Sequence, residues 1–204
     1  MRTFVVKGNL CFSRSMDELA LMEHSHIVVE GGRVAGVFRT LPERYAQLPV
    51  LDYGEQLILP GMTDLHVHAP QFAFRGLGMD MELLEWLNTY TFPEESKYKE
   101  LEYADRAYSS FVEHLLHSTT TRAAIFATIH VPATKLLMQK LDEAGLSCYV
   151  GKVNMNRNSP VYLREISTNQ ALRDTESWLC ETKEAYRNVK PILTPRFIPS
   201  TLRP

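Results

Sequence analysis

The sequence predicts an α/β protein in which a β-rich N-terminal module precedes a series of strand–helix units. Residues 1 to 58 contain short strand patterns and no amphipathic run of helix length. From residue 59 to residue 204, apolar strands alternate with amphipathic helices four times, which is typical of parallel βα units. This second region is too short for a complete (β/α)8 barrel, which needs about 250 residues. Half a barrel and a small open α/β sheet both fit the pattern, and composition alone favours the open sheet.

The N-terminal module is predicted from three stretches. "RTFVVKGNLCFS" has the pattern of a strand. "SHIVVEGGRVAGVF" predicts a hairpin, because Gly31 and Gly32 separate two arms of alternating apolar residues. "VLDYGEQLILPG" predicts two further short strands. We therefore place one β-rich domain at residues 1–58 and a second domain at residues 59–204.

The second domain is predicted element by element. Its strands are expected in "LILPGMTDLHVH", "TRAAIFATIH", "LSCYVGKVNM" and "VKPILTPRF". Apolar residues recur every three or four positions in "MELLEWLNTYTF", "KELEYADRAYSSFVEHLLHS", "PATKLLMQKLDEAG" and "STNQALRDTESWLCETKEAYRN", which predicts helices. Ser167 or Thr168 is expected to cap the last helix. Pro191 and Pro195 predict a short fourth strand with irregular ends.

Composition and charge exclude several classes of protein. The 204 residues include 22 basic and 24 acidic side chains in mixed order, so no basic nucleic-acid face is expected. No apolar run approaches the roughly 18 residues that span a bilayer, so no membrane partner is expected. The N-terminus has the pattern of a strand rather than of a signal peptide. Three widely spaced cysteines without a CxxC pair predict a reducing, cytoplasmic location.

Two histidines end the first strand of the second domain. Residues i and i+2 of a strand point to the same face, so His66 and His68 are predicted to project together while Val67 faces the other way. Two neutral imidazoles side by side form a bidentate site for zinc or a similar ion. The competing interpretation is a solvated strand end without metal, because a lone HxH pattern is short and common.

Polar residues also stand at the ends of the other three predicted strands. His130 ends the second, Asn154 the third, and Arg196 with Phe197 the fourth. The carboxyl ends of parallel strands carry the chemistry of βα barrels. Catalytic zinc usually has three or more protein ligands, and His130 is a weaker candidate than the histidine pair because a loop role serves it equally well.

Several segments resemble the guanine deaminase family of the amidohydrolase superfamily. "LPGMTDLHVHAPQ" resembles the PGxxDxHxH strand that opens the superfamily's barrel. "APQFAFRGLGMDMELLEWLNTYTFPEE", "TTTRAAIFATIH", "YVGKVNMN" and "VKPILTPRF" are similar to the guanine deaminase family in order and spacing. The resemblance runs from residue 59 to about residue 198. It implies an N-terminal β-sandwich module followed by the first four βα units of a (β/α)8 TIM barrel.

The resemblance also implies chemistry: one zinc ion and hydrolysis of guanine to xanthine and ammonia. By position, His66 and His68 match metal ligands. Five further residues match the purine pocket: Gln71, Leu83, Trp86, Arg196 and Phe197. An arginine fork suits a purine oxygen, a glutamine offers one donor and one acceptor, and an aromatic ring offers a stacking face. Packing in a helix core explains Trp86 equally well. Members of the family are often dimers, so the resemblance allows a homodimer.

The sequence departs from the family pattern after the fourth strand. No HxxE segment follows residue 197, so no catalytic acid/base and no later histidine or aspartate ligand is found in the chain. "STLRP" also leaves the family pattern, which predicts a truncated or frame-shifted end. We therefore expect the 204-residue chain to bind zinc weakly and to lack activity alone. The alternatives are an aminohydrolase for another heterocycle, a non-catalytic fragment that needs a partner chain, and an open α/β binding protein.

Overall fold

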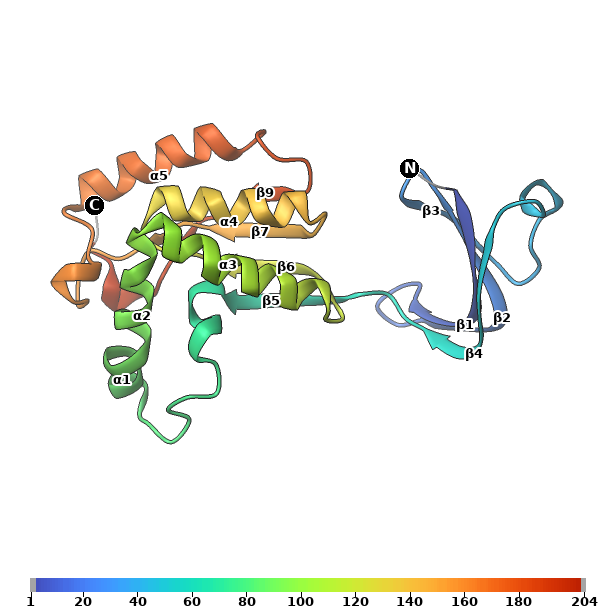
Figure 1. Cartoon of the computed structure of the whole chain (residues 1–204), viewed down its shortest axis with the longest axis horizontal. Helices are drawn as coiled ribbons and strands as arrows, with labels where there is room; N and C mark the ends of the chain where they lie inside the picture. The colour runs from blue at the N-terminus through green and yellow to red at the C-terminus, as the bar shows by residue number, and fades with distance from the viewer. Residues whose placement is uncertain (1–2, 203–204) are drawn as a thin grey trace. The chain divides into compact units, whose positions relative to one another are not determined.

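The computed structural model describes residues 3–202 and divides the chain into two compact units, Met1–Pro60 and Gly61–Pro204. The first unit is a four-stranded sheet, and the second is a parallel sheet with helices (Figure 1). Within residues 3–202, none of the helices combines the length and the apolar character that crossing a bilayer requires.

The first unit contains β1 (Phe4–Ser13), β2 (Leu19–Glu30), β3 (Arg33–Phe38) and β4 (Val50–Ile58) in the order β3-β2-β1-β4. Both hairpin contacts are antiparallel, and β1 pairs with β4 in parallel. A small core of Val5, Val28 and Tyr45 forms beside the sheet. Residues 3–60 supply one sheet, so the second layer of a sandwich stays a prediction.

Glycines with positive φ angles lie at the β2–β3 turn and at the bulge in β4. Gly31 and Gly32 have φ angles of 57° and 79°, the left-handed values that a two-residue hairpin turn requires, so the predicted turn is confirmed. The predicted pair of strands in "VLDYGEQLILPG" is instead one strand, β4. Gly54, at φ 57°, lets β4 bulge, and the pairing with β1 shifts register between Lys7 and Asn9.

The second unit is built on the parallel sheet β5-β6-β7-β9. Its strands are β5 (Met62–His68), β6 (Thr120–Phe126), β7 (Ser147–Gly151) and β9 (Val189–Pro191). The third and fourth strands continue, after a break, as β8 (Val153–Asn154) and β10 (Thr194–Pro195), which pair with each other. The four predicted strands are therefore confirmed, and the fourth is short and interrupted as its prolines predict.

The predicted helices are also present. The first is divided into α1 (Leu83–Trp86), a π-helical segment (Leu87–Thr91) and α2 (Phe92–Ser96). The others are α3 (Leu101–Leu116), α4 (Val131–Glu143) and α5 (Thr168–Thr182). The Ser167 hydroxyl caps α5 by accepting the backbone N–H of Gln170 at 3.2 Å. Short 3-10 turns follow β5 (Ala69–Phe74) and β10 (Ile198–Ser200).

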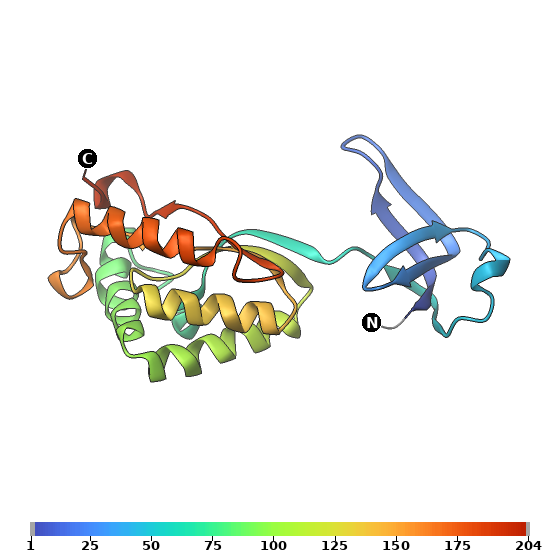
Figure 2. The ribbon, with the colours of Figure 1, turned by 90° about the horizontal axis from the view of Figure 1, so that it is seen from above.

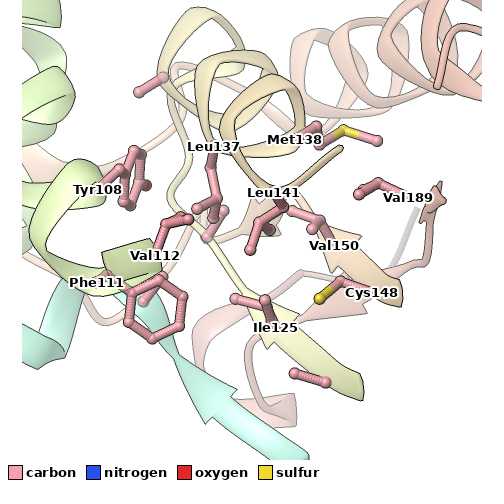
Figure 3. Packing of buried hydrophobic residues seen from close by; sticks show 14 of the residues in the cluster. Tyr108, Phe111, Val112, Ile125, Leu137, Met138, Leu141, Cys148, Val150 and Val189 are labelled. Atoms are coloured by element: carbon pink, nitrogen blue, oxygen red, sulfur yellow. The ribbon is translucent and has the colours of Figure 1, made fainter. Parts of the chain in front are cut away.

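The main core lies between the sheet and helices α3, α4 and α5, which run beside one another in both views of the ribbon (Figure 2). Phe111 from α3 and Leu137 from α4 point toward Ile125 of β6 and Val150 of β7 (Figure 3). Trp178 of α5 is fully buried in the same cluster. Burying such side chains contributes about 1.5–3 kcal/mol each, so this face of the sheet is the stable base for the strand ends.

The other face of the sheet is open. Leu65 of β5 is 79% exposed, and Tyr149 of β7 is 56% exposed although it alternates with the buried residues Cys148 and Val150 on the same strand. This alternation places apolar side chains on both faces, as in a sheet built to be covered on both sides.

Candidate active site

The histidine pair lies at the carboxyl end of β5. The imidazole rings of His66 and His68 have centroids 5.1 Å apart, so the two side chains project to one side, as the strand period predicts. Phe126, at the end of the neighbouring strand β6, contacts both rings. Its centroid lies 4.7 Å from His68 in a stacked arrangement and 5.0 Å from His66 in an edge contact. This aromatic contact restricts the orientation of both imidazoles.

Each histidine has a distinct environment. The backbone N–H of His66 donates to the Asp64 carboxylate at 3.0 Å, so the aspartate of the motif contacts the backbone of its own strand. The Nδ1 atom of His68 is buried, and no hydrogen-bond partner for it is found within residues 3–202. Burial, with smaller contributions from Arg196 and His66, lowers the pKa of His68 to about 3, so this imidazole stays neutral at physiological pH.

One cavity of about 590 Å³ brings together the seven residues that the resemblance matches to metal ligands and to the purine pocket. They come from β5, from the turn after it, from α1, and from the end of the fourth strand. The lining includes His66, His68, Gln71, Leu83, Trp86, Arg196 and Phe197. Residues separated by up to 131 positions in the sequence therefore share one concave site, at the strand ends where βα folds bind ligands.

A buried carboxylate that sequence reasoning missed supports this cavity. Glu95 of α2 accepts a hydrogen bond from Arg196 Nη1 at 2.5 Å and one from Gln71 Nε2 at 3.3 Å. The side chains of Arg196 and Glu95 are 4% and 2% exposed. Burial raises the pKa of Glu95, and the Arg196 guanidinium and the Gln71 amide oppose that rise. The only trace of this role in the sequence is that Glu95 ends the "FPEE" segment.

The apolar wall of the cavity is fixed mainly through Trp86. Its indole Nε1 donates to the backbone carbonyl of Leu77 at 3.0 Å, and its ring lies 5.5 Å from that of Phe74. Leu83, one turn earlier, is 66% exposed. Phe197, which follows the buried Arg196 in the sequence, also lines the cavity and is 38% exposed. The wall therefore combines one anchored aromatic ring with two accessible apolar side chains.

His130 and Asn154 do not join this cavity. His130 stands at the start of α4, in a separate cavity with Lys99 and Trp178, and burial lowers its pKa. Asn154 donates to Glu165 and to Thr175, within a network beneath the strand ends. Across residues 3–202 no group of three or more His, Cys, Asp or Glu side chains is arranged to hold a metal. The histidine pair is thus the candidate metal-binding element of the described chain.

The arrangement supports a definite kind of chemistry. Two adjacent nitrogen donors, one of them held neutral by burial, provide part of a metal site. A guanidinium and an amide provide directed polar contacts, and the aromatic wall accommodates a flat ring. A planar, polar heterocycle next to a metal ion is the ligand that these groups fit together.

Comparisons with known proteins agree with this geometry. Residues 57–201 match the model of the Amidohydrolase family. The chain is 40% identical over 155 residues to a guanine deaminase of Dictyostelium discoideum and 40% identical over 143 residues to that of Mus musculus. Those matches cover 76% and 70% of this chain but 34% and 32% of the relatives.

A solved structure gives the same result. A crystal structure of guanine deaminase from C. acetobutylicum with bound guanine superposes with a TM-score of 0.93 and 44% identity, covering 98% of this chain and 48% of that one. The predicted fold class, a β module followed by four βα units of an amidohydrolase-type barrel, is confirmed. The chain spans about a third of the length of the curated relatives and about half of the solved structure.

Proposed function

The chain belongs to the amidohydrolase family, and on that premise we propose that it forms part of the active site of a zinc-dependent guanine deaminase. The reaction is the hydrolysis of guanine to xanthine and ammonia. One observation carries the proposal: the histidine pair and the Gln71–Arg196 pair line the same cavity. The similarity to guanine deaminases along residues 57–201 supports the choice of substrate.

The residues present fit zinc as two of its ligands. His66 and His68 would hold the ion, because their rings are adjacent and His68 Nδ1 is buried without a protein partner in the described chain. A bound zinc ion would supply Lewis-acid activation of water for attack on the ring carbon that carries the amino group. Catalytic zinc usually has three or more protein ligands, so this pair alone would bind the ion weakly.

The other residues of the cavity would hold the purine. Arg196 would donate hydrogen bonds to a purine oxygen from its planar guanidinium. Gln71 would contact a neighbouring ring position. Trp86, Leu83 and Phe197 would cover the faces of the ring and exclude water from it. A group that moves protons to the departing ammonia is not assigned to this chain, and we expect the 204-residue polypeptide alone to show no turnover.

The cellular setting belongs to the same proposal. Cys11, Cys148 and Cys180 are free thiols, which supports a reducing cytoplasm.

A chimera tests the proposed function. This chain would replace the aligned half of the C. acetobutylicum guanine deaminase, and ammonia release from guanine, adenine and a triazine would be measured with zinc present. We expect guanine to be the preferred substrate, His66→Ala to abolish turnover, and Arg196→Lys to raise KM. Preference for another heterocycle, or full activity of the His66→Ala chimera, would refute the proposal.

Zinc binding by the unmodified 204-residue chain is a separate measurement. Competition with a chromophoric chelator should detect weak binding that is lost in the His66→Ala/His68→Ala double variant. Equal zinc affinity of wild type and double variant would remove the histidine pair from the proposed site.

A further inference from the structure

Glu95 connects the two polar side chains that face the proposed purine. Its Oε2 accepts from Arg196 Nη1 at 2.5 Å, and its Oε1 accepts from Gln71 Nε2 at 3.3 Å. Glu95 is 1% exposed, so water competes little for these contacts. The carboxylate is therefore a bridge from α2 to the ends of the first and fourth strands of the sheet.

This bridge fixes which polar atoms remain free. Arginine keeps its charge at any pH compatible with folding, so the ion pair favours the ionised form of Glu95, which can only accept hydrogen bonds. Gln71 must then direct its NH₂ group toward Glu95 and present its carbonyl oxygen elsewhere. Within residues 3–202, the remaining guanidinium N–H groups of Arg196 make no hydrogen bond. The cavity thus offers one amide acceptor and several guanidinium donors.

We propose that Glu95 is a positioning residue that sets the hydrogen-bonding polarity of the purine cavity, so that Gln71 accepts from a ring N–H and Arg196 donates to the adjacent carbonyl. This inference rests on the proposed function. An N–H beside a C=O is the lactam edge of guanine. Adenine presents the reverse pattern, with a ring nitrogen acceptor beside an amino donor. Glu95 therefore selects guanine over adenine without touching either base.

The surroundings of Glu95 hold it in place. Glu95 lies on α2, the helix that directly follows the π-helical segment. Phe92, one turn earlier on α2, places the centroid of its ring 5.8 Å from the Arg196 guanidinium. Glu94, the preceding residue, is also buried but bonds to Lys97 and Tyr103 instead of to the cavity. Glu94→Gln is therefore a matched control: the same chemical change, one residue away, on a carboxylate with other partners.

The Glu95→Gln substitution is expected to invert the hydrogen-bonding group that Gln71 presents to the cavity, from an acceptor to a donor. The new amide has one acceptor, which Arg196 would occupy, and one NH₂ group, which would face Gln71. Gln71 must then rotate to accept, and it presents its own NH₂ group to the cavity. A donor in place of an acceptor repels the guanine N–H. Adding Gln71→Glu to Glu95→Gln restores an acceptor at this position and keeps the total charge.

The test uses NMR on the 204-residue chain. The guanidinium Nη–H signals of Arg196, assigned with Arg196→Lys, report its order without ligand, and titrations with guanine and adenine report selectivity. We expect Glu95→Gln to broaden the Arg196 signals and to reduce the guanine-to-adenine affinity ratio by about tenfold or more, since a hydrogen bond to a charged group is affected. Glu94→Gln should change neither the Arg196 signals nor the affinity ratio. The Gln71→Glu/Glu95→Gln double variant should recover most of the wild-type guanine-to-adenine affinity ratio.

The outcomes separate the two claims. A folded Glu95→Gln variant that keeps both the Arg196 signals and the affinity ratio overturns the role of Glu95. A wild-type chain that binds neither purine overturns the proposed function. In that case the Arg196 signals still decide whether Glu95 positions the arginine, because they are recorded without ligand. Equal losses in Glu95→Gln and Glu94→Gln indicate general destabilisation of α2 and also overturn the inference.

Discussion

Replacing Glu165 with alanine tests how far buried charge stabilises the strand ends beneath the cavity. The Glu165 carboxylate accepts from Lys152 Nζ at 2.5 Å, from Asn154 Nδ2 at 3.3 Å and from the backbone N–H of Met155 at 2.7 Å. The side chains of Lys152 and Glu165 are 1% and 8% exposed. The Glu165→Ala variant would leave the Lys152 ammonium buried, with the Val153 carbonyl as its remaining hydrogen-bond partner.

The expected cost follows from that burial. Removing one partner of a buried ion pair typically destabilises a protein by about 3–5 kcal/mol, because the other charge stays desolvated. With a urea m-value of about 2 kcal/mol/M, the unfolding midpoint would fall by about 2 M. The exposed pair Lys135–Glu181, at 2.7 Å, is the matched control. Glu181→Ala should shift the midpoint far less than Glu165→Ala, because water screens that pair.

Urea unfolding followed by circular dichroism at 222 nm measures both variants. The signal reports the second unit, since α3, α4 and α5 all belong to it. Similar midpoint shifts for Glu165→Ala and Glu181→Ala would refute the argument from burial. A Lys152→Met/Glu165→Gln double variant should recover part of the loss, because it removes the uncompensated charge.

Further predictions concern thiols and glycines of the second unit. Burial raises the pKa of Cys148 to about 11, so a disulfide reagent at pH 8 should label exposed Cys180 in the folded Cys11→Ala variant and reach Cys148 only in urea. The Cys148 thiol loses its proton at a lower pH in the unfolded chain than in the folded one, so the free energy of unfolding should fall as pH rises from 9 to 11. Cys148→Ala should therefore reduce the fall in urea midpoint over that range. Gly151→Ala would place a Cβ 2.2 Å from the Thr194 side chain and should destabilise the second unit by about 1–3 kcal/mol in urea unfolding. Gly145→Ala meets no atom within 4 Å but has φ +76°, so it should cost about 1 kcal/mol from backbone strain alone; equal costs for the two glycines would contradict the steric argument.

Periodicity was sufficient to predict the strand–helix order and the shared side of His66 and His68. A strand repeats every two residues, so the spacing of the pair fixes its geometry without knowledge of the rest of the fold. The π-helical division of the first helix and the continuous β4 were not predicted, because local patterns do not specify how a chain accommodates an inserted residue.

The membership of the cavity was predicted from resemblance, whereas its internal support was not. Glu95 lies 24 residues from Gln71 and 101 residues from Arg196 in the sequence. No local pattern connects partners at those separations. Phe126 was missed for a related reason: an aromatic residue at the end of a strand is ordinary core by pattern, and only the sheet order places its ring against both imidazoles.

The two faces of the parallel sheet have a consequence for how such a chain can diversify. The main hydrophobic core lies on the helix-covered face, whereas His66, Gln71 and Arg196 lie at or just after the strand ends. Changes at the tips therefore leave the packed layer intact, and changes in the packed layer leave the reacting groups in place. A chain divided in this way can acquire a new substrate through a few substitutions while its folding remains as it was.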